Sequence, residues 1–150
     1  MSGVERTIHL ERSRARAWAV QVLYQWEMSG EGSPETMLRQ TLGKRLVGVT
    51  RIPYLRRLIE TYGAHRAEVD AAITGALKNW RLERLAALDR SILRVAATEV
   101  LLIEEVPRTV AIHEAVLLAE RYGGADSPPF VNGVLEALER VPPRGSARVP

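Results

Sequence analysis

The sequence predicts an all-α protein, a single-domain bundle of about seven helices. Apolar residues recur at helical spacing through most of the 150 residues, whereas the alternation that marks a half-buried strand is hard to find. Proline, glycine and serine divide this pattern into separate segments. With 46% hydrophobic residues, a chain of this length can bury one core, and neither an internal repeat nor a second domain is evident.

The first helix has the clearest amphipathic pattern. Residues 1–10 form a polar N-terminal lead, and the helix is expected to begin with the arginine-rich residues that follow and to end at Gly30. Its apolar face consists of Ala15, Trp18, Ala19, Val22, Leu23 and Trp26. Because these positions share one side of a helix, this face is expected to enter the core.

Caps and breakers mark the helices that follow. Ser33 caps a second helix that begins at Pro34 and extends towards residue 46, and Pro53 begins a third that Gly63 ends. Pro107 stops the fifth helix. The fourth to seventh helices are expected at about residues 65–78, 85–104, 109–122 and 127–140.

Positive charge is concentrated at the two ends of the chain. Residues 1–16 hold four arginines and two glutamates, and residues 141–150, a flexible basic tail beyond the helical domain of residues 11–140, hold two arginines. The net charge is only +3, so the body is close to neutral. This placement favours a local basic patch for a polyanion over a generally basic protein. The alternative is that basic ends merely keep the chain soluble.

Composition excludes several classes of protein. The chain has no cysteine, which rules out a disulfide scaffold, a cysteine-ligated metal and thiol catalysis, and which suits a reducing cytoplasm. The start does not resemble a signal peptide, and the longest apolar stretch, residues 92–103, is too short to cross a bilayer. We therefore expect a cytoplasmic protein without membrane contact.

No catalytic, metal-binding or cofactor-binding motif is recognisable. His113 and Glu114 begin like the zinc-protease motif, but Leu117 stands where the metal needs a second histidine. Gly43 and Lys44 lack the rest of a phosphate-binding loop. We therefore expect no enzyme, no metal and no cofactor.

Arg12, Arg14 and Arg16 lie where the first helix is expected to start. Backbone N–H groups already make a helix start positive, so each arginine there lowers the stability of the helix unless a bound anion neutralises its charge. A phosphate would do so, and guanidinium groups that fan around the helix suit a bent single strand of RNA. The alternative is that the arginines pair with Glu5, Glu11 or an acid from another helix.

A second anion-friendly feature follows residue 122. A glycine turn precedes Ser127, which is expected to cap the last helix, and the N–H groups of such a start suit phosphate. Phe130, the only phenylalanine, lies in the first turn of that helix. It can stack on an unpaired base, or it can simply fill the core.

A second, narrower apolar strip runs along the first helix. It contains Ala17, Val20 and Tyr24. The strip is either covered by another helix, which is the commoner fate of such a surface, or offered to a protein partner.

Two groups of residues resemble the signature of a known family. Residues 12–16, with Ala19, Gln21, Leu23 and Tyr24, look like its opening helix. The rest of the signature lies in residues 88–96, 99, 106–107, 110–112, 114–116, 118–119, 122–123, 127 and 130–135. The chain thus resembles the bacterial transcription antitermination factors of the NusB family over about residues 12–138, most weakly between residues 31 and 81.

This resemblance implies a function. NusB proteins are all-helical and bind the boxA element of nascent ribosomal operon transcripts as a heterodimer with NusE, a small-subunit ribosomal protein. By resemblance, this chain binds single-stranded boxA RNA and NusE within the RNA polymerase antitermination complex, without catalysis. The residues that match the family's RNA surface are Arg12, Arg14, Arg16, Asp126, Ser127 and Phe130. Tyr24 and Asp89 match positions that face NusE, and Val20 belongs to the same strip as Tyr24.

Three positions depart from the family pattern. Ser13 stands where many relatives have a basic residue, Pro129 where lysine is common, and His113 where asparagine is usual. The first two departures reduce the positive charge of the expected RNA surface.

Two other functions fit the same residues. A NusB-like domain also precedes the catalytic part of certain ribosomal RNA cytosine methyltransferases, but such an enzyme needs a cofactor-binding sheet and a nucleophilic cysteine, so only a detached domain would fit. The other is a self-associating helical protein, with the strip of Val20 and Tyr24 buried in a homodimer.

Overall fold

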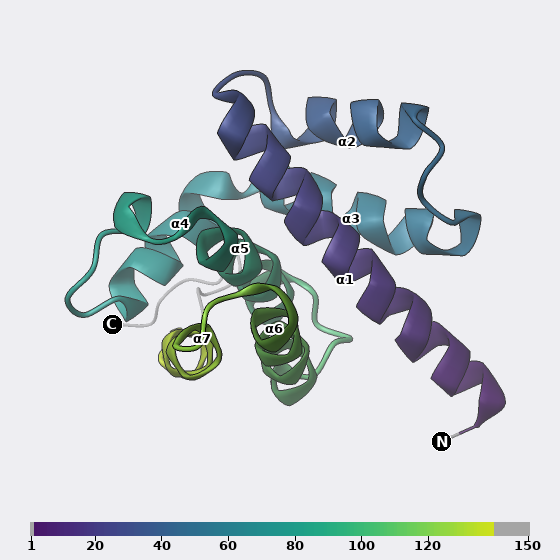
Figure 1. Ribbon diagram of the computed structural model, residues 1–150. Helices are drawn as coiled ribbons and strands as arrows, with labels where there is room; N and C mark the ends of the chain where they lie inside the picture. Colours follow the sequence, from purple (N-terminus) through teal and green to yellow (C-terminus); the bar gives the residue numbers. More distant parts are fainter. Residues whose placement is uncertain (1, 140–150) are drawn as a thin grey trace, which may run out of the picture.

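The protein is built from helices. The structure, a computed structural model, describes residues 2–139, in which there are seven α-helices, two short 3-10 helices and no strand. The elements are α1 (Gly3–Ser29), α2 (Pro34–Gly43), η1 (Val49–Arg51), α3 (Ile52–Ala64), α4 (Arg66–Ala76), η2 (Leu82–Arg84), α5 (Ala87–Leu102), α6 (Arg108–Tyr122) and α7 (Ser127–Glu136). The predicted all-helical bundle is confirmed (Figure 1). α7 ends at Glu136, so the prediction that the last helix continues to about residue 140 is wrong, and the predicted tail of residues 141–150 lies outside the described residues.

α5 is the central helix of the bundle. It packs against α1, α3, α4, α6 and α7, while α2 packs on α1 and α3. Figure 1 shows α1 crossing the molecule diagonally, with α6 and α7 on its lower left. Residues 90–99 of α5 are all buried, so this stretch has no solvent-facing side. The charged residues within it therefore need partners inside the protein.

α1 begins at Gly3, so the prediction that the arginines lie at the helix start is wrong. Ser2 caps the helix, and its Oγ accepts a hydrogen bond from the N–H of Glu5 at 3.1 Å. Serine followed by glutamate at this spacing is the capping-box pattern, and Glu5 also places negative charge at the positive end of the helix dipole. Arg12 lies beyond the first turns, where that dipole no longer acts, so the electrostatic argument for a phosphate at the helix start does not hold.

The first part of α1 projects from the bundle. Residues 2–10 are all exposed, and in Figure 1 this purple segment extends past the other helices. Val4, Ile8 and Leu10 retain 71%, 48% and 46% of their accessible surface. The expected polar lead is therefore a helical arm, which we call the N-terminal arm (residues 3–10).

Two other helix boundaries differ from the prediction. α2 ends at Gly43 instead of continuing towards residue 46, and Arg45 adopts a left-handed φ of 55° that turns the chain away. Gly63 lies inside α3 and does not end it. An added Cβ at Gly63 would overlap the Glu35 carboxylate of α2, so this glycine leaves the space that the end of the Glu35 side chain occupies. None of the described helices has the length and hydrophobicity needed to span a membrane.

Candidate nucleic-acid interface

Arg16 is buried in the core, so the prediction of an exposed fan of three arginines is wrong at this residue. Its side chain is 3% exposed, and Nε donates to Glu99 Oε1 and Oε2 at 2.8 and 2.9 Å. Nη1 lies 3.3 Å from Glu114 Oε1, and the Tyr54 hydroxyl donates to Glu99 Oε2. These contacts agree with the alternative that the arginine pairs with acids from other helices. A phosphate cannot reach Arg16 without opening this network.

Burial and charge both shift ionisation in the network. Burial alone would lower the pKa of Arg16, but the hydrogen bonds that it donates to Glu99, and the charge of Glu99, raise it overall. Burial and the charge of Glu99 raise the pKa of Tyr54 well above its ordinary value. Arg16 therefore stays charged and Tyr54 stays a neutral donor. One sequence signal pointed to this buried ion pair. Glu99 is a carboxylate within an apolar stretch, and a buried carboxylate is stable only with a cation beside it.

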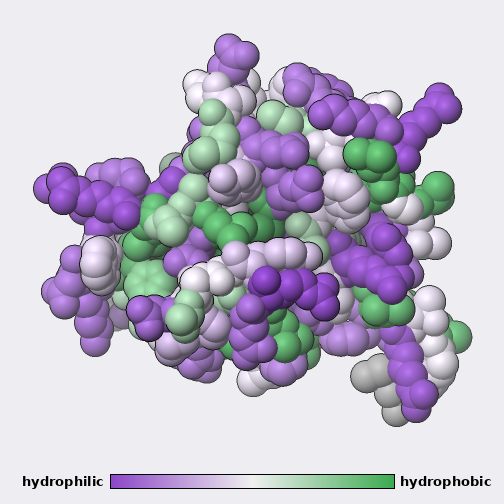
Figure 2. Space-filling model, viewed as in Figure 1, coloured by the Kyte–Doolittle hydropathy of each residue, from purple (hydrophilic) through white to green (hydrophobic). Residues whose placement is uncertain are grey.

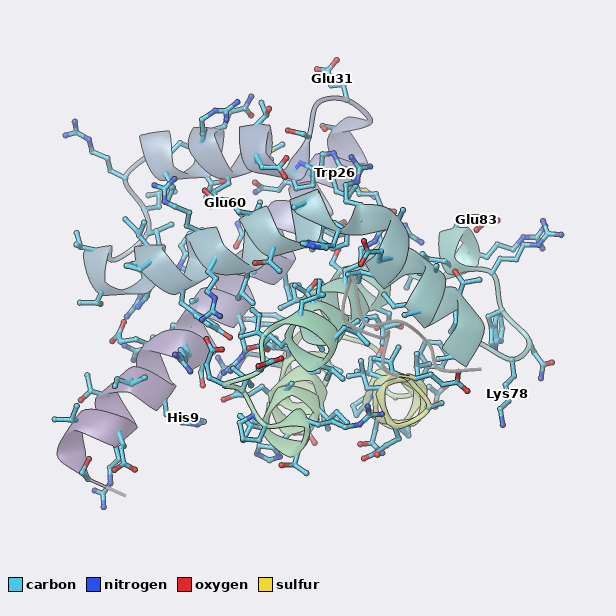
Figure 3. All side chains as sticks on the ribbon, turned by 180° about the vertical axis from the view of Figure 1, so that it is seen from behind. His9, Trp26, Glu31, Glu60, Lys78 and Glu83 are labelled. Carbon is cyan, nitrogen blue, oxygen red and sulfur yellow. The ribbon has the colours of Figure 1, made fainter. Side chains whose placement is uncertain are left out.

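Ser13, which stands where many relatives have a basic residue, connects α1 to α6. Its Oγ lies 2.5 Å from Glu114 Oε1, to which it donates, and His9 Nε2 lies 3.3 Å from the same oxygen. Figure 3 shows His9 on α1, on the side that faces the body of the protein. Glu114 is thus surrounded by Ser13, His9 and Arg16, and it anchors α6 against the arginine-bearing stretch of α1. His113, the neighbouring departure, is exposed.

Arg12 and Arg14 keep their guanidinium groups within reach of a ligand. Arg12 is half-buried, with Cζ 4.8 Å from the centroid of the Tyr54 ring, a cation–π contact, and none of the described carboxylates forms an ion pair with it. Arg14 is exposed, and its nearest carboxylate, Glu11, is 4.0 Å from Nη1. An exposed pair at that distance contributes little, so Arg14 is available to a stronger anion.

Glu11 joins α1 to η1. Its Oε2 accepts hydrogen bonds from Thr50 Oγ1 at 2.8 Å and from Arg51 Nε at 3.2 Å. The hydrogen bond from Thr50, together with the hydrogen bond and charge of Arg51, lowers the pKa of Glu11. This contact fixes Arg51 beside the exposed face of α1.

Residues 127–130, the first turn of α7, offer no free backbone N–H group, so they lack the donors on which the predicted phosphate site depends. The N–H of Ser127 donates to Gly124 O at 3.0 Å and that of Phe130 to Asp126 O at 3.3 Å, while Pro128 and Pro129 have no N–H. Ser127 is also not the cap. Asp126 holds that position, and Ser127 Oγ accepts from the N–H of Gly124 at 3.0 Å.

The turn between α6 and α7 still contributes surface residues. Asp126 is exposed, Ser127 is buried, and Phe130 is half-buried against the core, between the two roles considered for it. Gly123 is extended, with φ −90° and ψ −179°, and not left-handed as a helix-ending glycine often is. An added Cβ there would lie 2.6 Å from Ser127 Cβ and 2.8 Å from Ala119 O, so the glycine allows the turn to pack tightly.

An apolar groove of about 760 Å³ lies between α1, the start of α5 and the end of α6. Its apolar lining includes Ala17, Val20, Tyr24, Leu88 and Tyr122. Figure 2 shows hydrophobic side chains gathered near the centre of this face, with hydrophilic ones around them. Val20 is 3% exposed at the base of the groove, whereas Tyr24 is 39% exposed. The strip is therefore part core and part surface.

The residues predicted to face a partner lie around this groove. Val20 and Tyr24 line it, and Asp89 is half-buried in the first turn of α5, next to the lining residue Leu88. Sequence reasoning missed the groove residues Arg51, Arg121 and Tyr122. Helical periodicity identifies the faces of one helix, but it does not show which other elements meet them.

A second buried ion cluster lies near the C-terminal end of α1 and has a structural role. Glu27 pairs with Arg90 and Arg94, and Arg94 Nε also donates to Asp70 Oδ1 at 3.1 Å. In Figure 3, this end of the molecule lies near the labels of Trp26 and Glu31. Both arginines of the cluster already have carboxylate partners, so it is a poor candidate for binding RNA. The described residues contain no group of histidines and carboxylates able to hold a metal ion.

Comparison with known proteins gives one consistent family. Residues 13–140 match the model of the NusB family. The chain is 39% identical to the transcription antitermination protein NusB of Bacillus mycoides (strain KBAB4) over 130 residues, which are 87% of this chain and 98% of that protein. Among solved structures, it is similar to NusB of T. maritima, with a TM-score of 0.74 and 32% identity, over 83% of this chain and 87% of that one. A crystal structure of the antitermination factors NusB and NusE in complex with double-stranded RNA gives a TM-score of 0.74 and 28% identity, over 85% of this chain and 94% of that one.

Proposed function

The chain belongs to the NusB family, and from that premise we propose that it is a transcription antitermination factor that binds RNA together with NusE. The similar complex of NusB and NusE with RNA supports both partners. The finer proposal is that the RNA is single-stranded boxA of ribosomal RNA operon transcripts, bound within the antitermination complex of RNA polymerase in the cytoplasm. The relatives are named for antitermination and not for a catalysed reaction.

One observation carries this proposal: an exposed arginine stands at the edge of an apolar groove. Arg14 lines the groove that also contains Val20 and Tyr24, so a basic surface for RNA adjoins an apolar surface for a protein. The proposed RNA surface comprises Arg12, Arg14, Asp126 and Phe130, because Arg16 and Ser127 are buried and already bonded. The proposed NusE surface comprises Val20, Tyr24 and Asp89.

The test is a titration of boxA RNA with the full chain, with and without purified NusE. We expect NusE to increase RNA affinity, and Arg14→Ala to reduce it in both conditions with a weaker dependence on salt. Arg39→Ala is the matched control, because Arg39 is an exposed arginine on α2, away from the groove. A duplex of the same sequence tests the strand requirement. Failure of the wild type to bind RNA, or of NusE to change its affinity, would overturn the proposal.

A homodimer that uses the groove is a second candidate, because the exposed face of Tyr24 lies in an apolar recess large enough to receive side chains from another chain. Light scattering of the wild type and of Tyr24→Asp distinguishes this candidate. A dimer that Tyr24→Asp dissociates, and that persists when NusE and RNA are added to the wild type, would favour self-association over the heterodimer.

A further inference from the structure

The apolar groove continues into a second cavity along α1. This cavity, of about 610 Å³, lies between the first half of α1 and α6. It shares Arg14, Ala17 and Arg121 with the apolar groove. The two cavities therefore adjoin, with the small side chain of Ala17 between them. Arg14 from α1 and Arg121 from α6 stand on the two walls at this junction, which we call the waist.

Arg14 and Arg121 lie at the waist without a close carboxylate partner. Two acids also line the second cavity: Glu114 is already bonded to Ser13 and Arg16, and Glu120 forms no ion pair with either arginine. Among the described residues, the carboxylate within ion-pair distance of Arg14 is Glu11, at the limit of 4.0 Å, and Glu11 is already bonded to Thr50 and Arg51. No described carboxylate pairs with Arg121, whose Cζ is 6.0 Å from the Tyr122 ring centroid. Like charges on opposite walls repel, and an anion between them would turn that repulsion into attraction.

The surroundings favour a phosphodiester over a lone carboxylate. Arg121 lies in the last turn of α6, directly before the turn that carries the proposed RNA residue Asp126, while Arg14 belongs to the proposed RNA residues of α1. Tyr122, which is 52% exposed, offers a ring face next to the waist on which a base can stack. Guanidinium groups match the oxygens of a phosphate with two parallel N–H donors.

We propose that Arg121 is a further RNA-binding residue, which together with Arg14 holds one phosphate of the RNA strand across the waist. This inference rests on the proposed function, because it requires that the chain binds RNA. It joins the two parts of the RNA surface, on α1 and on the α6–α7 turn, into one path.

The test is a double-mutant cycle on RNA affinity, measured with the full chain and boxA RNA at several salt concentrations. Arg121→Ala is expected to weaken binding roughly tenfold and to reduce the salt slope by about one, as Arg14→Ala does. Because both residues hold the same phosphate, the double variant is expected to lose less than the product of the two single losses. Arg121→Lys, which keeps the charge without the paired donors, is expected to lie between wild type and Arg121→Ala.

The controls separate this inference from the proposed function. If Arg14→Ala weakens binding while Arg121→Ala behaves like Arg39→Ala, the waist does not hold a phosphate and the proposed function stands. If Arg121→Ala leaves RNA binding unchanged but weakens NusE binding, Arg121 pairs with an acidic side chain of NusE and not with a phosphate. The inference is then also overturned. Multiplicative losses in the double variant would show that the two arginines hold different groups.

Discussion

The buried pair of Arg16 and Glu99 is the most demanding contact at the scale of single residues. It joins α1 to α5, and Glu99 also accepts from the Tyr54 hydroxyl of α3. Each charge has lost its water, so each depends on the other for compensation. One of the three arginines predicted to bind RNA is therefore a structural residue, while its neighbours Arg12 and Arg14 remain open to a ligand.

Removing the charge of Glu99 tests this assignment. Glu99→Gln is expected to lower the free energy of unfolding by about 3–5 kcal/mol, because Arg16 keeps its charge in the core with one partner fewer. Urea denaturation at neutral pH measures the change. Glu60→Gln is the control, since the Glu60 side chain is 54% exposed and 3.8 Å from Arg56. That variant is expected to change stability by less than about 1 kcal/mol. Equal losses in both variants would contradict the buried role.

Gly123 is a packing position. Gly123→Ala is expected to destabilise the protein by roughly 1–3 kcal/mol, because the added methyl group would lie within 3 Å of Ser127 and of Ala119 O. Gly133→Ala is the matched control on α7, where an added Cβ meets nothing within 4 Å. This helical position is expected to gain about 0.5–1 kcal/mol from alanine. Thermal unfolding of both variants measures whether each substitution raises or lowers stability. A stabilising Gly123→Ala would disprove the close contact.

At the scale of elements, α1 carries most of the candidate site. Its N-terminal arm is exposed, its middle joins Arg16 and Ser13 to the core and to α6, and its exposed face presents Arg14 and Tyr24. The connection to η1 through Glu11 holds the exposed face in register with Arg51. The geometry of the site therefore depends on contacts between elements that are distant in sequence.

The Glu11 contact is expected to depend on pH. Because its pKa is lowered in the folded state, its contribution to stability is present above the ordinary glutamate value of 4.5 and is lost as the pH falls through the folded value. The melting temperature of wild type is expected to exceed that of Glu11→Gln at neutral pH, and the difference is expected to vanish at low pH. Circular dichroism melts between neutral and acidic pH measure this. A difference in melting temperature that stays constant with pH would contradict the contact of ionised Glu11 with Thr50 and Arg51.

The elements were largely predictable from the sequence, but the site was predictable only in part. Proline, glycine and apolar spacing located the helices because these signals are local. The start of α1 was missed because a polar capping box does not show in hydrophobic periodicity, and the anion site predicted at α7 lacks donors because Pro128 and Pro129 have no N–H group. Which arginine is buried depends on Glu99 and Glu114, and only the packing of α1 against α5 and α6 brings these together.

At the scale of the whole molecule, one core connects the elements through α5. Every other described α-helix except α2 packs on α5, and α2 packs on two helices that do. Ion pairs cross the same interfaces, from α1 to α5 at both Arg16 and Glu27. No described helix has a core of its own, so local unfolding of one of them removes support from its neighbours.

This arrangement predicts cooperative unfolding in a single transition. Far-ultraviolet circular dichroism reports all helices. The change in tryptophan fluorescence on unfolding reports mainly Trp18 and Trp26 of α1, which pack on the core, because the third tryptophan, Trp80, is already 62% exposed in the folded protein. The two denaturation curves are expected to coincide when both are normalised. A fluorescence transition that clearly precedes the loss of helix would show that α1 detaches from the bundle as a separate unit.

The packing of α1 also determines which of its positions tolerate substitution. One helix of 27 residues contributes to the core, to the surface proposed for RNA and to the groove proposed for a protein. Over residues 11–26, substitutions on different faces should fail for different reasons: inward ones through loss of folding, outward ones through loss of recognition by a correctly folded chain. The N-terminal arm, apart from His9 with its contact to Glu114, should accept most replacements. A library of single substitutions, scored separately for abundance and for RNA binding, should therefore show two interleaved periodic profiles along one helix.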